Sequence, residues 1–220
     1  MEFNIIDLNT WERKPYFEHF LNHTRCTFSM TANIDITKLL ERTRVEDIKF
    51  YPTFIYMVMK VVNSHVEFRT CFDEEGRLGY WEQMNPSYTI FHNDDKTFSD
   101  LWTDFNLDFN SFHKSYQEDM KQYGEVKELS PKKQAPQNLV PISCIPWTSF
   151  TGFNLNIFND GTYLLPIITG GKYFNQEDKV LLPISLQVHH SVCDGYHASH
   201  FFKEMQQLAD NCNEWLNVHF

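Results

Sequence analysis

The spacing of apolar residues along the chain predicts helices at three places. Segments 35–44 (DITKLLERTR), 51–65 (YPTFIYMVMKVVNSH) and 195–216 (GYHASHFFKEMQQLADNCNEWL) all have apolar positions at helical spacing. Pro52 suits the first turn of the second helix. The apolar positions are Phe54, Ile55, Val58, Val61 and Val62 in the second helix, and Ala198, Phe201, Met205, Leu208, Cys212 and Trp215 or Leu216 in the last.

Other segments alternate at the period of a strand. Residues 72–81 (FDEEGRLGYW) predict a strand, a turn at Gly76 and a second strand. Residues 153–169 predict a hairpin, because apolar residues alternate with asparagines before the turn-forming Asn159-Asp160-Gly161. The polar stretch 125–138 predicts a surface connection within one domain of residues 1–220. Helices therefore interleave with strands around one mostly buried sheet, an α/β (α+β) class.

A long predicted strand, 179–190 (KVLLPISLQVHH), ends in two histidines. Its period of two places His190 on the apolar row and His189 on the more polar row. Pro183 indicates an edge strand or a bulge, where the ladder can spare a donor.

An imidazole in an apolar row is costly when charged, which favours a neutral ring that accepts protons. His190 is therefore a candidate general base, and the alternative is a core histidine satisfied by backbone groups. A metal site is disfavoured, because neighbouring strand residues point to opposite faces and no H-E-x-x-H or C-x-x-C pattern supplies further ligands to His197 and His200. Asp194, before Gly195, suits a turn or a helix cap.

Composition narrows the function classes. The chain has 220 residues, 20 of them Phe, and a formal net charge of −10 at pH 7, which argues against a nucleic-acid partner. The early acidic residues argue against a signal peptide, and no apolar run is long enough for a membrane span. Five scattered cysteines predict free thiols and a cytoplasmic location.

The chain resembles the chloramphenicol acetyltransferase family. The resemblance rests on QVHHSVCDGYH at 187–197, which matches the family's H-H-x-x-x-D-G signature, and on further segments such as NTWERKPYFEHF, KFYPTFIY and ISCIPWTSFTGFNLN. It implies a mixed β-sheet with helices, as in CoA-dependent acyltransferases, and a homotrimer with active sites between subunits. It also implies that acetyl-CoA acetylates a hydroxyl of chloramphenicol and so inactivates the antibiotic, without a metal.

The resemblance also assigns roles to residues. His190 matches the general base, Ser143 the group that bonds the oxyanion of the tetrahedral intermediate, and Thr169 a threonine that holds a water there. Asp194 and Arg13 match an ion pair that braces the histidine turn. Positions matching the CoA site are Lys49, Tyr51, Trp147, Lys172 and Tyr173, and those matching the acceptor pocket are Phe20, Cys26, Phe28, Phe98, Phe153, Leu155 and Ile167.

Three other hypotheses remain. The dihydrolipoamide acyltransferases share the D-G ending of the motif, but they carry Arg after the histidine, where this chain has Ser191. A CoA-dependent acyltransferase could use another small alcohol. A non-catalytic protein could bind aromatic small molecules in a Phe-lined pocket, and it would release no CoA thiol.

Overall fold

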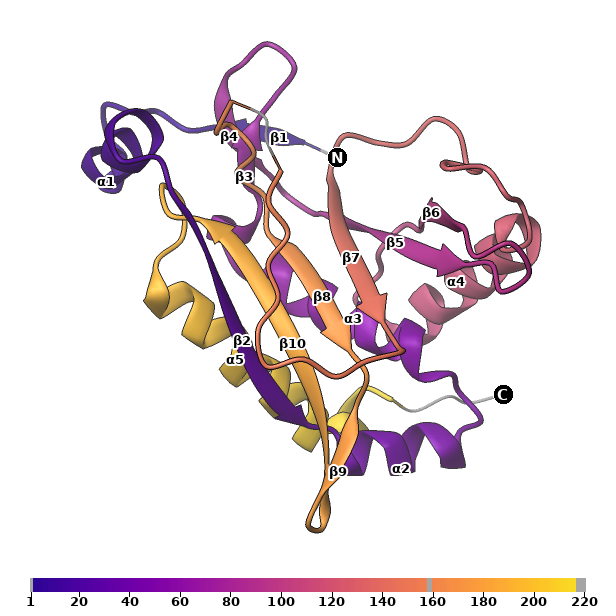
Figure 1. Ribbon diagram of the computed structural model, residues 1–220. Helices are drawn as coiled ribbons and strands as arrows, with labels where there is room; N and C mark the ends of the chain where they lie inside the picture. The colour runs from indigo at the N-terminus through magenta and orange to yellow at the C-terminus, as the bar shows by residue number, and fades with distance from the viewer. Residues whose placement is uncertain (1, 158–159, 217–220) are drawn as a thin grey trace.

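The computed structural model describes residues 2–157 and 160–216, which form two β-sheets with helices (Figure 1). The smaller sheet has the strand order β1-β4-β3, and the larger sheet has the order β2-β10-β8-β7-β5-β6, with β9 paired to β10. In the larger sheet β7 is parallel to β5 and β8, and the other pairs are antiparallel, so the predicted mixed sheet is confirmed. The strands are β1 (Phe3–Ile5), β2 (Thr27–Asp35), β3 (Thr70–Phe72), β4 (Leu78–Trp81), β5 (Asn85–Phe91), β6 (Phe98–Trp102), β7 (Leu139–Ile145), β8 (Ile167–Gly171), β9 (Phe174–Gln176) and β10 (Lys179–His189).

Helices α3 and α5 cover one face of the larger sheet, and the connection from β7 to β8 crosses the other face (Figure 1). The helices are α1 (Lys14–Glu18), α2 (Thr37–Val45), α3 (Phe50–Ser64), α4 (Phe109–Tyr123) and α5 (Gly195–Asp210), with short helical turns η1 (His19–His23), η2 (Val66–Phe68) and η3 (Cys212–Glu214). No helix among residues 2–157 and 160–216 is long and apolar enough to cross a membrane.

The buried core lies between the larger sheet and its helices. In the apolar row of β10, Leu182, Ile184, Leu186 and Val188 are buried there and Val180 is partly buried. The five positions of α3 predicted from helical spacing are all buried. This confirms the helix at 51–65, and α2 confirms the helix at 35–44. The last helix ends at Asp210 rather than at 216, and Leu208 is only half-buried, because the chain leaves α5 for the turn η3.

The turn at Gly76 is confirmed, since Gly76 has a φ of 74° and joins the paired strands β3 and β4. The hairpin predicted over 153–169 is wrong. Residues 153–157 form no strand, Phe158 and Asn159 lie outside the described residues, and β8 pairs with β7 and β10 instead. Side chains of β10 bind this segment: Ser185 Oγ donates to the Phe153 carbonyl, and Gln187 Oε1 accepts from the Leu155 N–H at 3.0 Å.

Strand β10 lies between β2 and β8, so of the two positions offered for Pro183, an edge strand or a bulge, the edge strand is wrong. Pro183 faces Asn33 of β2 on one side. On the other side it lies between two ladders, because pairing with β9 ends at Leu181 and pairing with β8 begins at Ile184. A proline without an N–H donor is tolerated at such an interruption.

The predicted surface connection 125–138 is confirmed as irregular chain that covers the edge strand β6. The Asp100 N–H donates to the Leu129 carbonyl at 2.7 Å, and Lys132 Nζ donates to the Trp102 carbonyl at 3.2 Å. These bonds satisfy backbone groups of an otherwise exposed sheet edge.

Candidate active site

His190 is the first residue after β10, in the turn that leads to α5. Its ring is stacked on Phe20, with centroids 3.8 Å apart, and meets the edge of Phe28 at 5.3 Å. Nδ1 lies 3.1 Å from the Cys193 carbonyl oxygen. A carbonyl oxygen can only accept, so Nδ1 carries the proton and Nε2 of the neutral ring is left free to accept one.

The sequence placed His190 inside the apolar row of the strand, and this is wrong, because β10 ends at His189. His190 is half-buried, whereas His189 is 3% exposed and bonds Ser191 Oγ through Nδ1 at 2.7 Å. Burial lowers the pKa of His189. The desolvation expected at the second histidine is therefore found at the first.

The turn after β10 is held by Arg13, which comes from the segment just before α1. Its guanidinium donates to the carbonyls of Ser191 and His190 at 3.1 and 3.3 Å and to Asp194 Oδ2 at 3.1 Å. The predicted ion pair of Arg13 and Asp194 is thus present. The turn is also bonded to the residue before β2, because the His190 N–H donates to the carbonyl of Cys26 at 3.0 Å.

Asp194 also caps α5, because its carboxylate accepts from the Tyr196 N–H at 3.0 Å. Partial burial opposes ionisation of this carboxyl, but the bond from Arg13 and the charge of His197 hold its pKa below the usual value. Capping and bracing, which the sequence left as alternatives, occur together.

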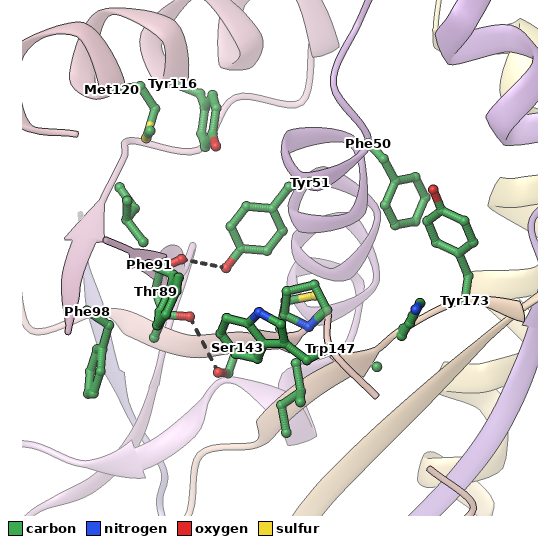
Figure 2. Close-up of a pocket in the computed structure, with 16 residues that line it drawn as sticks. Phe50, Tyr51, Thr89, Phe91, Phe98, Tyr116, Met120, Ser143, Trp147 and Tyr173 are labelled. Atoms are coloured by element: carbon green, nitrogen blue, oxygen red, sulfur yellow. Dashed lines mark hydrogen bonds between the residues drawn. The ribbon is translucent and has the colours of Figure 1, made fainter. Parts of the chain in front are cut away.

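A cavity of about 760 Å³ lies on another part of the larger sheet, around Ser143 at the end of β7 (Figure 2). Ser143 Oγ is 3.4 Å from Thr89 Oγ1, and the Tyr51 hydroxyl donates to the Thr89 carbonyl at 3.2 Å. Lys172 is the one charged residue in the lining described for this cavity. The lining consists of Phe50, Tyr51, Thr89, Ile90, Phe91, Phe98, Tyr116, Met120, Ser143, Cys144, Ile145, Pro146, Trp147, Gly171, Lys172 and Tyr173.

Burial shapes the chemistry of this cavity. It raises the pKa of Tyr51, and it raises the pKa of the Cys144 thiol to about 11. Both groups are therefore neutral at physiological pH. Trp147 is 58% exposed and meets the edge of Phe91 at 4.5 Å, which leaves much of its surface available at the mouth.

The structure divides the predicted site residues into groups. Ser143, Tyr51, Trp147, Lys172, Tyr173 and Phe98 line the cavity. Phe20, Phe28 and Cys26 adjoin His190. Thr169 is buried beside Ser143, and Ile167 is buried at the start of β8. Phe153 and Leu155 lie over β10. Lys49 is the exposed N-cap residue of α3 and is not part of the cavity lining.

Sequence reasoning missed several lining residues. Thr89 and Phe91 alternate along β5, where they read as ordinary strand positions, and Tyr116 and Met120 come from α4. Thr89 could be found only from the register of β5 and β7, in which Tyr88 pairs with Ile142 and Thr89 therefore lies beside Ser143. Pairing between strands so distant in sequence cannot be read from one strand alone.

The residues around His190 and the residues around Ser143 are far apart within one chain. Ser143 pairs with Thr169, and Thr169 pairs with Ser185, so Ser143 and Ser185 are two strands apart. His190 lies five residues after Ser185, just past the end of β10. With strands about 4.8 Å apart and a rise of about 3.3 Å per residue, His190 and Ser143 are on the order of 20 Å apart.

The histidines and cysteines do not assemble into a metal site in the part of the chain that the structure describes, where no cluster of three or more His, Cys, Asp or Glu side chains could hold an ion. His197 and His200 belong to the first turns of α5, and the partners of His197 are carboxylates.

Comparison with known proteins gives a consistent result. The sequence model of a family described as "Chloramphenicol acetyltransferase" matches residues 1–206. A chloramphenicol acetyltransferase of Clostridium butyricum is 59% identical over 98% of this chain and 99% of that protein.

Two solved structures share the fold. A chloramphenicol acetyltransferase superposes with a TM-score of 0.85 over 94% of this chain and 100% of that chain, at 22% identity. The dihydrolipoamide acetyltransferase of Azotobacter vinelandii superposes with a TM-score of 0.65 over 87% of this chain and 84% of that chain, at 16% identity.

Proposed function

Because the chain belongs to the chloramphenicol acetyltransferase family, we propose that it transfers the acetyl group of acetyl-CoA to a hydroxyl of chloramphenicol, with His190 as the general base. The observation that carries the proposal is the His190 ring between Phe20 and Phe28, whose Nδ1–H is held by the Cys193 carbonyl while Nε2 has no hydrogen bond to residues 2–157 or 160–216. Acetylation inactivates the antibiotic, so the protein would confer resistance. A cytoplasmic location is supported by five free cysteines.

The proposed reaction is a direct transfer. His190 Nε2 takes the proton of the acceptor hydroxyl, and the oxygen attacks the thioester carbonyl. The carbonyl π electrons move onto the oxygen, which gives a tetrahedral oxyanion. When this intermediate collapses, the carbon–sulfur bond breaks, and the imidazolium of His190 returns its proton to the CoA thiolate.

Ser143 is the proposed donor to the oxyanion. Its hydroxyl has Thr89 Oγ1 as a neighbour at 3.4 Å, a contact long enough to yield when a charged acceptor arrives. Thr169 lies beside Ser143 in the register of β7 and β8 and is 2% exposed. We assign it the positioning of a water near the same oxygen.

The cavity around Ser143 suits the thioester arm of CoA. It is largely apolar, and its one charged lining residue, Lys172, supplies a cation for a phosphate against the overall charge of −10. Tyr51, Trp147 and Tyr173 offer aromatic surface along it. Lys49 stands outside the lining, at the exposed start of α3, where it can meet only a distal phosphate.

We propose that the acceptor pocket forms where the residues around His190 meet the residues around Ser143 in one site. Phe20, Cys26 and Phe28 would contribute from the His190 side. Phe98 of the cavity lining and Ile167, two residues before Thr169 on β8, would contribute from the Ser143 side. Phe153 and Leu155 cross the sheet face between them. Leu155 and Phe98 are 42% and 54% exposed in the single chain, which supports their being covered by substrate or by another subunit.

We propose that the enzyme is a homotrimer whose sites lie between subunits. A general base must lie about 3 Å from the hydroxyl, and an oxyanion donor about 3 Å from the new oxyanion, so both must stand within several ångströms of each other. Within one chain His190 and Ser143 are on the order of 20 Å apart. A site built from His190 of one subunit and Ser143 of the next removes this conflict.

Release of the CoA thiol tests the proposed activity. Purified protein is mixed with acetyl-CoA, chloramphenicol and a chromogenic thiol reagent, and the acceptor is then varied across other small alcohols. We expect thiol release that depends on chloramphenicol and matches the amount of acetylated product. Binding of chloramphenicol without any thiol would instead identify a protein that sequesters the drug.

The ion pair that braces the turn gives a further prediction. Asp194→Asn is expected to lower the melting temperature by about 2–8 °C at pH 7, a cost of about 1–2 kcal/mol for a charged bond that is partly exposed to solvent. The folded pKa of Asp194 lies below its unfolded value, so this stabilisation is present above about pH 4 and lost as the pH falls through the folded pKa.

Calorimetry of both proteins at one concentration, at pH 7, 5 and 3, checks this prediction. The difference in melting temperature should persist at pH 5 and be smaller at pH 3, where the Asp194 carboxyl of the unfolded chain is mostly protonated. A difference that does not change with pH would mean that the Asp194 charge is not what stabilises the turn.

A further inference from the structure

The imidazole of His197, in the first turn of α5, has a carboxylate on each side. Nδ1 lies 3.0 Å from Asp194 Oδ1, and Nε2 lies 3.4 Å from Glu67 Oε1. The side chains of His197 and Glu67 are 19% and 28% exposed, so the contact is largely shielded from water. Glu67 belongs to the turn η2, and His197 therefore joins two segments that are distant in sequence.

The same ring closes a capping box at the start of α5. Nδ1 accepts the backbone N–H of Asp194 at 3.1 Å, while the Asp194 carboxylate caps the first turn. In most capping boxes a Glu or Gln at this third helical position reaches back to the N-cap N–H. With Nδ1 accepting, the ring proton is on Nε2 and faces Glu67. A protonated ring would donate from Nδ1 to Asp194 Oδ1, so both forms remain bound to Asp194.

Glu67 reaches the same turn a second time, through its backbone. Its carbonyl accepts from the Cys193 thiol at 3.6 Å, and the Cys193 carbonyl in turn accepts the Nδ1–H of His190 at 3.1 Å. Cys193 thus connects Glu67 to the His190 ring. The His197 side chain ties the next residue, Asp194, to the same glutamate.

We propose that His197 is a positioning residue for the acetyl transfer, because it joins Asp194 to Glu67 and so fixes the turn 190–194 that orients the His190 ring. This inference rests on the proposed role of His190 as the base. It gives His197 no contact with substrate, since its polar partners are Asp194 and Glu67.

The charges around His197 support this arrangement. The bond from His197 is the main cause that holds the pKa of Glu67 below its usual value, with partial burial acting against it. The Asp194 carboxyl also has a lowered pKa, to which Arg13 and His197 both contribute. Both carboxylates are therefore ionised at neutral pH, and Glu67 accepts from the Nε2–H of the ring while the Asp194 N–H donates to Nδ1.

Substitutions at position 197 test the inference in the full-length enzyme. His197→Ala is expected to lower kcat about 10- to 100-fold, as for a small misplacement of a reacting group, with KM for both substrates within about threefold. His197→Gln should recover kcat to within about fivefold of wild type, because glutamine can accept the Asp194 N–H and donate to Glu67. His200→Ala, one turn later on the same helix, is the matched control and should leave kcat unchanged.

Melting temperatures and kcat are measured on the same samples, so a loss of folded protein is separated from a loss of turnover. An alanine variant with kcat within about threefold of wild type would overturn the inference, as would a folded glutamine variant as slow as the alanine variant. If His197→Ala does not fold, Glu67→Ala removes the same link from the other side. A roughly tenfold drop in its kcat supports the inference, and an unchanged kcat contradicts it. Failure of the wild type to release thiol would refute the proposed function instead.

Discussion

Replacement of His190 by alanine is expected to lower kcat about 10³–10⁴-fold, in the upper part of the range for a positioned general base. The structure offers one free ring nitrogen at this place, because Nδ1 of His190 is bonded to the Cys193 carbonyl. The adjacent His189 cannot take over, since it is buried and its Nδ1 bonds Ser191. The acceptor hydroxyl would then have to lose its proton to water.

Steady-state rates at saturating concentrations of both substrates measure this loss, and an equilibrium titration with chloramphenicol shows whether binding survives. Binding should weaken only modestly, because the ring contributes one contact among several aromatic ones. His23→Ala, an exposed histidine of the nearby turn η1, is the matched control and should retain activity. A His190→Ala enzyme within a few-fold of wild type would remove His190 from the mechanism.

Replacement of Ser143 by alanine is expected to lower kcat about 10²–10³-fold, the usual loss when one oxyanion donor is removed. The hydroxyl faces the cavity, and the nearby Tyr51 hydroxyl is already bonded, because it donates to the Thr89 carbonyl. The donor acts on charge that develops during the reaction. The losses in kcat and in kcat/KM should therefore be equal, and KM should change little.

Ser149→Ala, an exposed serine a few residues further along the chain, is the matched control for this variant. Its rate should match that of the wild type. If Ser143→Ala raised KM and left kcat intact, the hydroxyl would be a binding contact for the ground state and not an oxyanion donor.

The sequence predicts those elements of the fold whose residues alone carry the signal, such as the spacing of apolar residues in one helix or a glycine in one turn. Helix α3 shows its buried face in the spacing of Phe54, Ile55 and Val58, and the turn at Gly76 needs a positive φ that glycine adopts readily. The hairpin predicted at 153–169 does not form, although Asp160 and Gly161 do have positive φ values. The bonds from Ser185 and Gln187 that hold this segment come from a distant strand, and no local pattern contains them.

The candidate site, too, could be predicted where it depends on neighbouring residues and not where it depends on contacts between distant segments. The motif around His190 and Asp194 is continuous in sequence, so its chemistry could be anticipated, and the pair of Arg13 and Asp194 is present as expected. The separation of His190 from Ser143 could not be predicted from the residues alone, because it depends on the order β10-β8-β7 and on the register of these strands. The link from His197 to Glu67 depends on how α5 packs beside η2, which also has no local signal.

The most direct test of a site between subunits is to combine two variants that each retain only a trace of activity. His190→Ala and Ser143→Ala chains, carrying different affinity tags, are co-expressed, and trimers that contain both tags are assayed for thiol release. If His190 of one subunit acts on the thioester held beside Ser143 of its neighbour, every trimer with both tags has both intact residues in one of its three sites, about one third. Activity is therefore expected to rise from the trace level of either variant alone to about one third of wild type. Mixed trimers that stay at the trace level would show that the two residues do not meet across subunits, and would contradict the account.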